Sequence, residues 1–513
     1  MTARAKPKSA VRRSPAQAGD SAWLGRVLAV IAAALAARLG FNALELIPVH
    51  FDEAQYWTYG KDPALGYYSK PPLSAWMIRI ATDLFGDTLF ALRFWMPLVH
   101  AWIAWLIFAT ARRLYDAQTG FWAALGYTLA PGVTASTGLM TTDPPMMTTW
   151  AIALYALIRV MTAPSGKSAP LPWLWWAVLG LAVGAGFYGK YTILAFLGGA
   201  LGYAVFSRTG RLQPRARRGP LIALIAGLAL LAPHLVWLVG NSFVSVAHLA
   251  ENAEQSGGLT PTGLPEFLGA QAGVIGPVFL LALAASSWPG GHRRRDWRWR
   301  ILAWLTLPLF LAMCVQSLSG GANANWAAPC YVAGAILAAR WLLTQRWRRG
   351  LWLQAGSGLV AAALLWGSAA LYAGYANALP RLPDPYKKMR LGAIVCEAAV
   401  TAMEETGAEV ILSDSRGRLA ECAWAAGLSP DQIRVWNPAG RIANHYEMTA
   451  SLTQADRATP MILIRLGRDA AGIAAQFATA EPIAAADATT HTDRAYPFEI
   501  WYVSGFRGYA DER

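Results

Sequence analysis

The sequence predicts an α-helical polytopic membrane protein that ends in a small soluble α/β domain. Hydrophobic residues make up 55% of the 513 residues and charged residues only 14%. The apolar residues lie in long blocks rather than in the alternating pattern of a half-buried strand, and such blocks are typical of helices that cross a bilayer. From about residue 376 onward the composition is that of an ordinary soluble protein. The chain is therefore expected to change structural class there.

The net charge of +14 belongs to the apolar part of the chain. Residues 1–376 contain 30 Lys+Arg and 13 Asp+Glu, a net of +17, which leaves 14 and 17, a net of −3, for residues 377–513. Cytoplasmic loops of membrane proteins retain Lys and Arg, so a basic excess of this kind orients helices. We therefore do not expect nucleic acid as a partner.

Three regions are expected along the chain. Residues 1–20, rich in Lys, Arg, Pro and Ser, form a disordered basic cytoplasmic tail. Residues 21–375 form the membrane domain, with outer loops at 47–86 and 241–266 that are long enough to be functional. Residues 376–513 form a soluble α/β domain that we expect in the periplasm.

The membrane domain contains about eleven apolar runs, several of them near the short limit for crossing the hydrocarbon core, so we expect about 11 to 13 transmembrane helices. Alternate connections between the runs carry clusters of Lys and Arg, which predicts a cytoplasmic amino terminus and a periplasmic carboxyl terminus. The predicted runs are 23–46, 89–111, 119–135, 144–161, 173–187, 192–206, 221–239, 267–288, 301–318, 326–343 and 351–372.

The soluble domain is predicted from short apolar runs. Residues 410–412, 461–464 and 500–503 are expected to form buried strands, and residues 391–405 an amphipathic helix. The sequence of this domain contains no nucleotide-binding glycine motif, so we expect the domain to cap the outer face of the membrane domain. Two of the four cysteines, Cys396 and Cys422, lie in it and could pair in an oxidising compartment, although spacing alone does not show that they meet.

Two adjacent carboxylates, Asp52 and Glu53, follow the first apolar run directly. Ionisable groups at the end of a membrane span are costly and usually functional. A simpler interpretation is that they cap an interfacial helix beginning near Ala54, because a carboxylate at a helix start accepts hydrogen bonds from free N–H groups. Capping needs only one carboxylate, so it leaves the other unexplained.

A second polar group lies on the same predicted face. Asp143 precedes two prolines at the outer start of a span, a pattern that also fits an N-cap. Lys70 and Lys190 are among the few cations on this face. Lone lysines near helix ends often extend to the interface, but two of them beside a carboxylate cluster favour a bound anion.

A lipid phosphate at the outer surface is the anion that fits. Lysine neutralises phosphate as a point charge, and stabilising a departing phosphate is the main electrostatic task of glycosyl transfer from a lipid phosphate. A carboxylate would accept the proton of an attacking hydroxyl, or orient an acceptor that is already anionic. The sequence thus predicts a carboxylate and an anion clamp in one site.

The order of these motifs resembles that of the GT-C membrane glycosyltransferases. The resemblance covers residues 24 to about 372 and is greatest to the branch of protein O-mannosyltransferases and bacterial lipid A aminoarabinose and galacturonic acid transferases. The motifs that carry it are Phe51-Asp52-Glu53-Ala54, Tyr68-Ser69-Lys70-Pro71-Pro72, Thr142-Asp143-Pro144, Gly189-Lys190 and Asn325-Trp326-Ala327-Ala328-Pro329.

The resemblance implies an inverting transfer of one sugar from a polyprenyl-phosphate donor to an acceptor at the periplasmic face of a bacterial inner membrane. Asp52 would be the essential acidic residue, with Glu53 and Asp143 as the other catalytic carboxylates. The residues expected to bind the donor phosphate are Lys70, Lys190 and His248. The residues expected to line the pocket or contact the acceptor are Tyr56, Tyr68, Asn325 and Trp326.

The chain departs from the aminoarabinose enzymes at Gln55, where those enzymes have an arginine, so one candidate phosphate ligand is missing. No cofactor is expected. Asp52, Glu53 and Asp143 could together hold a divalent metal through oxygen ligands, as in the more distant oligosaccharyltransferases. We do not favour a metal, because two lysines already neutralise the phosphate.

Alternative functions remain at this stage. The acceptor expected first is lipid A, lipopolysaccharide or another envelope glycolipid, with other membrane lipids surrounding the protein, and an exported protein is the alternative. A secondary transporter is a remote alternative, since ionisable residues in a polytopic protein often mark an ion pathway. Transporters place such residues near the midplane and contain internal repeats, whereas these residues lie at outer helix ends and no repeat is found.

Overall fold

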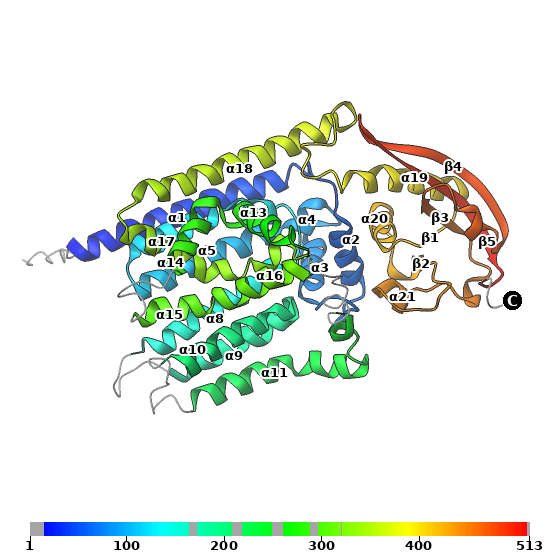
Figure 1. The fold of residues 1–513 in the computed structure, drawn as a ribbon. Helices are drawn as coiled ribbons and strands as arrows, with labels where there is room; N and C mark the ends of the chain where they lie inside the picture. The colour runs from blue at the N-terminus through cyan, green and yellow to red at the C-terminus, as the bar shows by residue number, and fades with distance from the viewer. Residues whose placement is uncertain are drawn as a thin grey trace, which may run out of the picture.

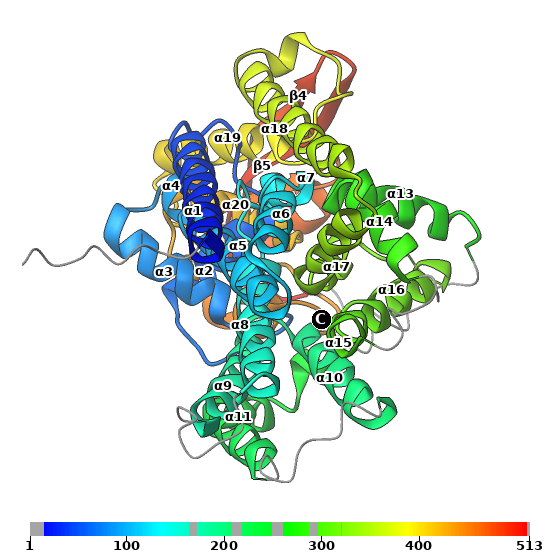
Figure 2. The same ribbon diagram turned by 90° about the vertical axis from the view of Figure 1, so that its left-hand side faces the viewer.

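The computed structural model describes residues 15–163, 172–207, 218–248, 260–287, 296–319 and 321–509. A bundle of long helices forms one part of the molecule, and a β-sheet with its own helices forms the other (Figure 1). In the view along the bundle, most long helices are seen nearly end on, so they run roughly parallel (Figure 2). The predicted tail at residues 1–20 lies mostly outside the described residues.

The helical bundle accounts for the chain up to residue 375. Five of its segments are long and apolar enough to cross a membrane, or six if one bent pair counts as a span, within the described residues. Each predicted apolar run falls on a helix or a pair of helices, while the predicted number of spans stays a prediction. The elements are α1 (Pro15–Asn42), α4 (Leu89–Arg93), α5 (Trp95–Leu114), α6 (Ala117–Thr128), α7 (Pro131–Ser136), α8 (Asp143–Met161), α9 (Pro172–Gly189), η1 (Tyr191–Ile193), α10 (Leu194–Phe206), α11 (Gly219–Gly240), α13 (Gly263–Ile275), α14 (Pro277–Ser287), α15 (Trp297–Trp304), α16 (Leu307–Ser319), η4 (Ala324–Ala327), α17 (Cys330–Thr344) and α18 (Arg348–Tyr375).

One predicted straight span is bent. The run 267–288 forms α13 and α14, which meet at an angle of 115°. Gly276 between them has a φ of +96°, a backbone conformation that side chains rarely adopt. Gln354 of α18 replaces the broken helical hydrogen bonds: its Nε2 donates to the Ile275 carbonyl at 2.7 Å, and its Oε1 accepts from the Phe279 N–H at 3.0 Å. A buried backbone break is tolerated only with such partners.

Two short helices, α2 (Phe51–Lys61) and α3 (Leu73–Phe85), lie between the bundle and the sheet (Figure 1). They come from the predicted outer loop 47–86. Eight of the eleven residues of α2 are buried, because the helix is covered from both sides. This layer carries the motif around Asp52.

The C-terminal sheet region, residues 390–506, contains a five-stranded sheet in the order β2-β1-β3-β5-β4. β1 pairs in parallel with β2 and β3, and β5 pairs antiparallel with β3 and β4. Its elements are α19 (Arg390–Thr406), β1 (Val410–Ser413), α20 (Arg416–Ala426), η6 (Pro430–Gln432), β2 (Ile433–Val435), α21 (His445–Thr449), η7 (Gln454–Asp456), β3 (Met461–Leu466), α22 (Ala471–Ala474), β4 (Phe477–His491) and β5 (Arg494–Phe506); η5 (Ala376–Ala378) links it to α18.

The three strands and the helix predicted here are confirmed, and β2 and β4 were not predicted. β4 is an edge strand rich in alanine, and most of its residues are not buried, so it lacks the apolar alternation that indicates a strand. Cys396 of α19 and Cys422 of α20 form a disulfide. The disulfide ties α19 to α20, and α20 packs on α2.

The C-terminal sheet region packs directly on α2. Trp57 meets Trp424 of α20 edge to face, with ring centroids 5.2 Å apart. The Thr58 and Tyr446 hydroxyls are 2.8 Å apart. Buried apolar residues of α2, α3, α19, α20 and the sheet form one continuous cluster. The two parts of the molecule therefore share a core at α2.

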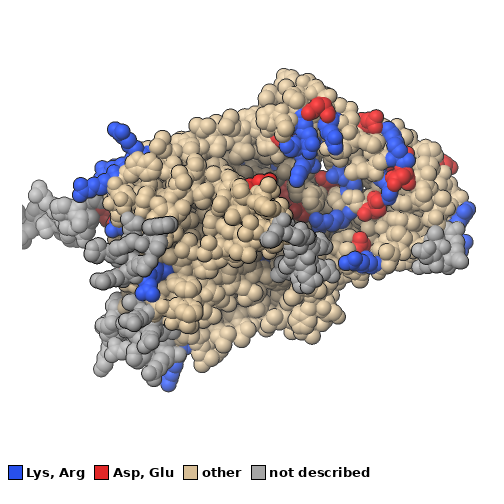
Figure 3. Space-filling model, viewed as in Figure 1, with Lys and Arg blue, Asp and Glu red and all other residues tan. Residues whose placement is uncertain are grey.

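Charged side chains lie mainly near the two ends of the face shown in Figure 3, and a broad belt between them is almost free of Lys and Arg. Such a belt fits the hydrocarbon layer of a membrane. Several of the predicted basic loops, including 164–171, 208–217 and 288–295, lie outside the described residues.

Candidate functional site

The helix α2 begins with a reciprocal cap. His50 is the N-cap, and its Nδ1 accepts from the Asp52 N–H at 3.2 Å. The Glu53 carboxylate accepts from the His50 N–H at 3.0 Å. Glu53 thus completes the capping box, and the helix starts at Phe51 rather than near Ala54 as the capping interpretation expected. Asp52 is left free of capping duty.

Glu53 is buried in an ion pair with Arg93 of α4. Its side chain is 1% exposed, and it accepts from Arg93 Nε at 2.9 Å and Nη2 at 2.8 Å. It also accepts from the Met140 N–H at 2.7 Å. Burial alone would raise the pKa of Glu53, but Arg93 and the two backbone donors outweigh burial and hold the pKa below its usual range. Glu53 is therefore a charged tie between α2, α4 and the segment that leads to Asp143.

Arg93 is a site residue that our sequence interpretation missed. Its Nη1 and Nη2 also donate to the carbonyls of Ile47 and Pro48 at 2.8 and 2.9 Å. A signal was present, because Arg93 is a further cation at an outer helix end, against the charge bias of that face. It orders the turn that carries the chain into α2.

Asp52 is the accessible carboxylate. Its side chain is 32% exposed, and the nearest ionisable partner is the His50 imidazole, 4.0 Å from Oδ2. Among the described residues no cation forms a closer ion pair with it. Asp52 therefore keeps oxygen lone pairs available for a ligand, unlike Glu53.

Asp143 is fixed by two donors. Lys190 Nζ donates to its Oδ1 at 2.8 Å, and Asn325 Nδ2 donates to its Oδ2 at 2.7 Å. Lys190 reaches it because α9 ends at Gly189, where a Cβ would lie 3.0 Å from the Met146 backbone. The structure thus brings together three residues that the sequence placed in separate motifs.

Lys70 faces the same group of charges. Its loop is pinned by Tyr67, whose hydroxyl donates to the Tyr59 carbonyl at 2.7 Å. Burial lowers the pKa of the Lys70 ammonium, and the positive charges of Lys190 and Arg416 lower it further, while Asp52 and Asp143 oppose them. Within the described part of the chain no hydrogen bond or ion pair of Lys70 Nζ is found. It is a half-buried cation with free donors.

The predicted pocket residues divide into two groups. Tyr56 is 3% exposed, and burial, then Asp52, raise the pKa of its phenol, with a further contribution from Asp143. Tyr68 instead faces the C-terminal sheet region, where its hydroxyl donates to the Ile442 carbonyl at 3.0 Å, and its ring lies 5.1 Å from His248. Trp326 lies beside Asn325 in η4 and is half-buried. No contact of Trp326 with the three carboxylates is found among the described residues.

Arg416 is the second residue that sequence interpretation missed. It begins α20, 361 residues away from Gln55, and its Nη1 donates to Gln55 Oε1 at 3.2 Å. Its guanidinium also lies over the Phe51 ring, 5.4 Å from the centroid. Only the packing of the C-terminal sheet region on α2 brings it here, so no local signal could have indicated it.

The site contains an alternating set of charges. The carboxylates Asp52 and Asp143 lie among the cations Lys70, Lys190 and Arg416, at the layer between bundle and sheet. No group of three or more His, Cys, Asp or Glu side chains suited to a metal ion occurs in the described ranges. The predicted loop 241–266 is described only up to His248 and from residue 260 onward, so Glu251 and Glu254 lie outside the described residues.

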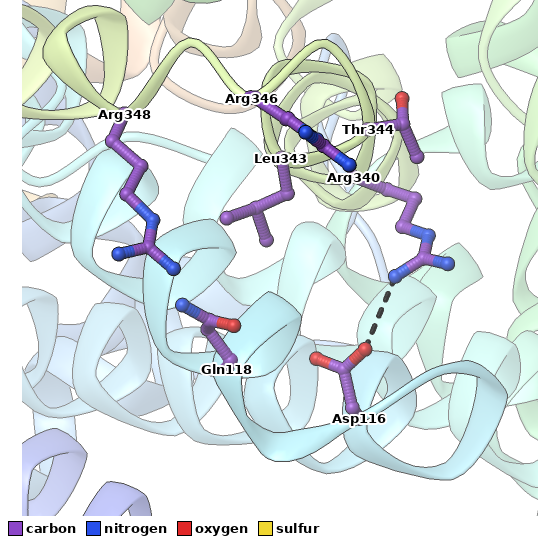
Figure 4. A pocket seen from close by; sticks show the side chains of 7 residues that line it. All are labelled: Asp116, Gln118, Arg340, Leu343, Thr344, Arg346 and Arg348. Atoms are coloured by element: carbon purple, nitrogen blue, oxygen red, sulfur yellow. Dashed lines mark hydrogen bonds and ion pairs between the residues drawn. The ribbon is translucent and has the colours of Figure 1, made fainter.

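A cavity of about 500 Å³ lies where the start of α6, the end of α17 and the start of α18 meet (Figure 4). This end of the bundle is the one away from α2 (Figure 1). In the cavity, Arg340 pairs with Asp116 at 3.1 Å, and the other lining residues are Gln118, Leu343, Thr344, Arg346 and Arg348. It contains no second carboxylate and none of the predicted site residues. We therefore take the charged group at α2, and not this cavity, as the candidate site.

Comparison with known proteins places the chain in a family. The dolichyl-phosphate-mannose-protein mannosyltransferase family matches residues 69–237. A lipid A galacturonosyltransferase of Rhizobium johnstonii is 32% identical over 428 residues, covering 81% of this chain and 87% of that protein. An undecaprenyl phosphate-alpha-4-amino-4-deoxy-L-arabinose arabinosyl transferase of Pseudomonas aeruginosa is 30% identical over 56% of this chain and 52% of its own length.

The fold is also similar to a solved one. The structure of ArnT from Cupriavidus metallidurans in the apo state matches with a TM-score of 0.67 at 14% identity, over 94% of this chain and 98% of that chain. The same enzyme bound to undecaprenyl phosphate matches with a TM-score of 0.63. At this identity the likeness concerns the fold alone.

These findings define a class of protein: a multi-pass membrane glycosyltransferase. The chain belongs to the GT-C superfamily, in the branch that contains the lipid A galacturonosyltransferases and aminoarabinose transferases. The resemblance noted in the sequence is thereby confirmed.

Proposed function

We propose that this protein transfers a uronic acid from a polyprenyl-phosphate donor to lipid A at the periplasmic face of the bacterial inner membrane. The observation that carries the proposal is the accessible Asp52 carboxylate beside Lys70, an unpaired cation. The name of the relative from Rhizobium johnstonii supports both the sugar and the acceptor. The lysine can bind the phosphate of the donor, and the carboxylate can accept the proton of the acceptor hydroxyl.

The reaction forms one bond and breaks another. The acceptor oxygen attacks the anomeric carbon of the sugar from the face opposite the phosphate, and the bond from that carbon to the phosphate oxygen breaks with inversion. Asp52 accepts the proton of the attacking hydroxyl. The polyprenyl phosphate leaves with the electron pair of the broken bond and gains a negative charge.

Lys70 and Lys190 stabilise that gained charge. Lys70 has free donors at the start, whereas Lys190 is held by Asp143 at 2.8 Å. Asp143, fixed by Asn325, aims the Lys190 ammonium toward the phosphate site. Cations already in place stabilise a leaving phosphate without reorganisation during the reaction. His248, beside Tyr68, would close over the donor from the loop that follows α11.

Glu53 has a positioning role in this proposal. All of its hydrogen-bonding capacity is directed at Arg93, Met140 and His50. It fixes the Asp52 helix relative to the segment that carries Asp143. A residue so fully paired and buried does not reach a substrate.

The proposed topology has about 11 to 13 spans, a cytoplasmic amino terminus and a periplasmic C-terminal sheet region. The alternation of Lys and Arg among the loops supports this orientation. We further propose that no divalent metal is needed, because the lysines supply the charge that a metal would supply. Activity that a chelator abolishes and manganese or magnesium restores would refute this.

The identity of sugar and acceptor is tested in cells. Mass spectrometry of lipid A and of envelope glycoproteins is compared between cells with and without the protein. We expect one added uronic acid residue on lipid A only when the protein is present. A modified envelope protein and unchanged lipid A would instead support the protein acceptor that the matching mannosyltransferase family suggests.

A further inference from the structure

We propose that Arg416, at the start of α20 in the C-terminal sheet region, binds the carboxylate of the donor sugar and so selects an acidic sugar. This inference rests on the proposed function, because it names the part of the site that recognises the uronic acid. It also gives the C-terminal sheet region a role in catalysis beyond covering the bundle.

Arg416 is held in place without a charged partner. Its Nη1 donates to Gln55 Oε1 at 3.2 Å, and its guanidinium carbon lies over the Phe51 ring. Gln55 is 2% exposed, and its Nε2 donates to the Tyr59 hydroxyl. The amide of Gln55 is therefore oriented so that its oxygen faces Arg416. The guanidinium is positioned by neutral groups, which leaves its charge available.

Two other arginines near it in the same region do have carboxylate partners. Arg418, two residues along α20, pairs with Glu421 at 2.5 Å, and Arg434 pairs with Asp456 at 2.7 Å. Arg416 has no carboxylate within 4.0 Å among the described residues. Guanidinium carries five N–H donors in a planar fork that matches a carboxylate with two parallel hydrogen bonds. A half-buried arginine with one neutral acceptor retains most of that fork.

The position of α20 favours the sugar over the phosphate. α20 lies on the far side of α2 from the bundle (Figure 1). A lipid-linked donor has its tail among the membrane helices and its phosphate near Lys70 and Lys190, so its sugar extends outward past α2. Arg416 lies on that outer side, in contact with α2 through Gln55. Its charge still acts within the same site, since it contributes to the lowered pKa of Lys70.

Two cations of the site have no ion pair within the described residues and are available to bind the two negative groups of an acidic donor, while Asp52 is kept as the proton acceptor. Lys190 is balanced by Asp143, which leaves Lys70 and Arg416 as cations that have no ion pair in the described structure. A polyprenyl-phosphate sugar has one charge on its phosphate, and a uronic acid adds a second. A neutral sugar would leave Arg416 unmatched, and an amino sugar would add a like charge beside it. Like charges at close range are a common basis of discrimination.

The test compares two donors that differ only at the sugar carboxylate. The full-length protein in proteoliposomes is given polyprenyl-phosphate galacturonic acid or polyprenyl-phosphate galactose, with the same lipid A acceptor. The variants are Arg416→Gln, Arg416→Lys and, as a matched control, Arg457→Gln, which alters an exposed arginine of the same region. We expect Arg416→Gln to lower kcat/KM for the uronic acid donor by about 10- to 100-fold and to leave the galactose donor unchanged.

The lysine variant should fall between wild type and glutamine, because it keeps the charge and loses the fork. Arg457→Gln should match wild type. An equal loss on both donors would place Arg416 on the phosphate or acceptor and overturn the inference, as would no loss on either. Where galactose turnover is too slow to measure, the same comparison is made on donor Kd. A wild-type protein that turns over galactose but not galacturonic acid would refute the proposed donor itself, which is a separate result.

Discussion

Replacing Arg93 by methionine should destabilise the protein more than almost any other single change near the site. Glu53 is 1% exposed and accepts four hydrogen bonds, two of them from Arg93. Arg93→Met removes the countercharge and leaves a buried carboxylate with only two backbone donors. Breaking a buried ion pair on one side costs about 3–5 kcal/mol of unfolding free energy. Glu53→Gln should cost less, since Arg93 keeps the carbonyls of Ile47 and Pro48.

The double variant separates a positioning role of Glu53 from a catalytic one. Glu53→Gln with Arg93→Met restores neutrality, so we expect about 2 kcal/mol or more of favourable coupling relative to the sum of the single changes. Unfolding free energies come from denaturant titration of the purified protein in mixed micelles, and transfer is measured in parallel. We expect the double variant to retain kcat/KM within about tenfold of wild type. A double variant that is as stable as expected but inactive would refute the positioning role.

Two further predictions concern the C-terminal sheet region. Replacing Cys396 and Cys422 by serine should lower the unfolding free energy of this region by about 3 kcal/mol, because the disulfide closes a loop of moderate length. The same change should raise KM for the donor, since α20 is held less firmly. A reductant that changes neither the unfolding free energy nor KM would contradict this prediction. Burial raises the pKa of Glu421 from 4.5 to about 7, against the opposing effect of Arg418. A raised pKa favours the protonated folded state, so this stability is present below the unfolded pKa and is lost as pH rises through about 7. Glu421→Gln should therefore reduce the loss of unfolding free energy between about pH 5 and about pH 8 by about 2 kcal/mol; an unchanged pH dependence would contradict it.

Much of the fold could be predicted because apolar runs report burial directly. The run 144–161 matches α8 closely, and the run 89–111 falls on α4 and α5. The break in run 267–288 could not be predicted, because it depends on Gln354, which supplies hydrogen bonds from a distant helix. Strand β4 was missed because it is rich in alanine and most of its residues are not buried, so no apolar alternation marks it.

The sequence predicted most of the residues that form the candidate site, but it predicted less well what each residue does there. Asp143 and Lys190 were expected on one face and are 2.8 Å apart. No sequence pattern shows which of Asp52 and Glu53 is buried, since adjacent residues on a helix point about 100° apart and only packing decides which of them faces the core. Arg416 depends on the docking of a whole region 361 residues along the chain from Gln55. A contact between residues so far apart in the chain cannot be predicted from local sequence patterns.

The roles of the two adjacent carboxylates are the centre of this account, and a single substitution tests them. Asp52→Asn keeps the shape of the side chain and removes its ability to accept a proton. Transfer from a polyprenyl-phosphate uronic acid to lipid A is measured in single turnover, with donor binding measured alongside. We predict that the rate falls by at least about 100-fold, as expected for loss of a general base, while the donor Kd stays near the wild-type value. Turnover at the wild-type rate with Asn at this position would contradict the account.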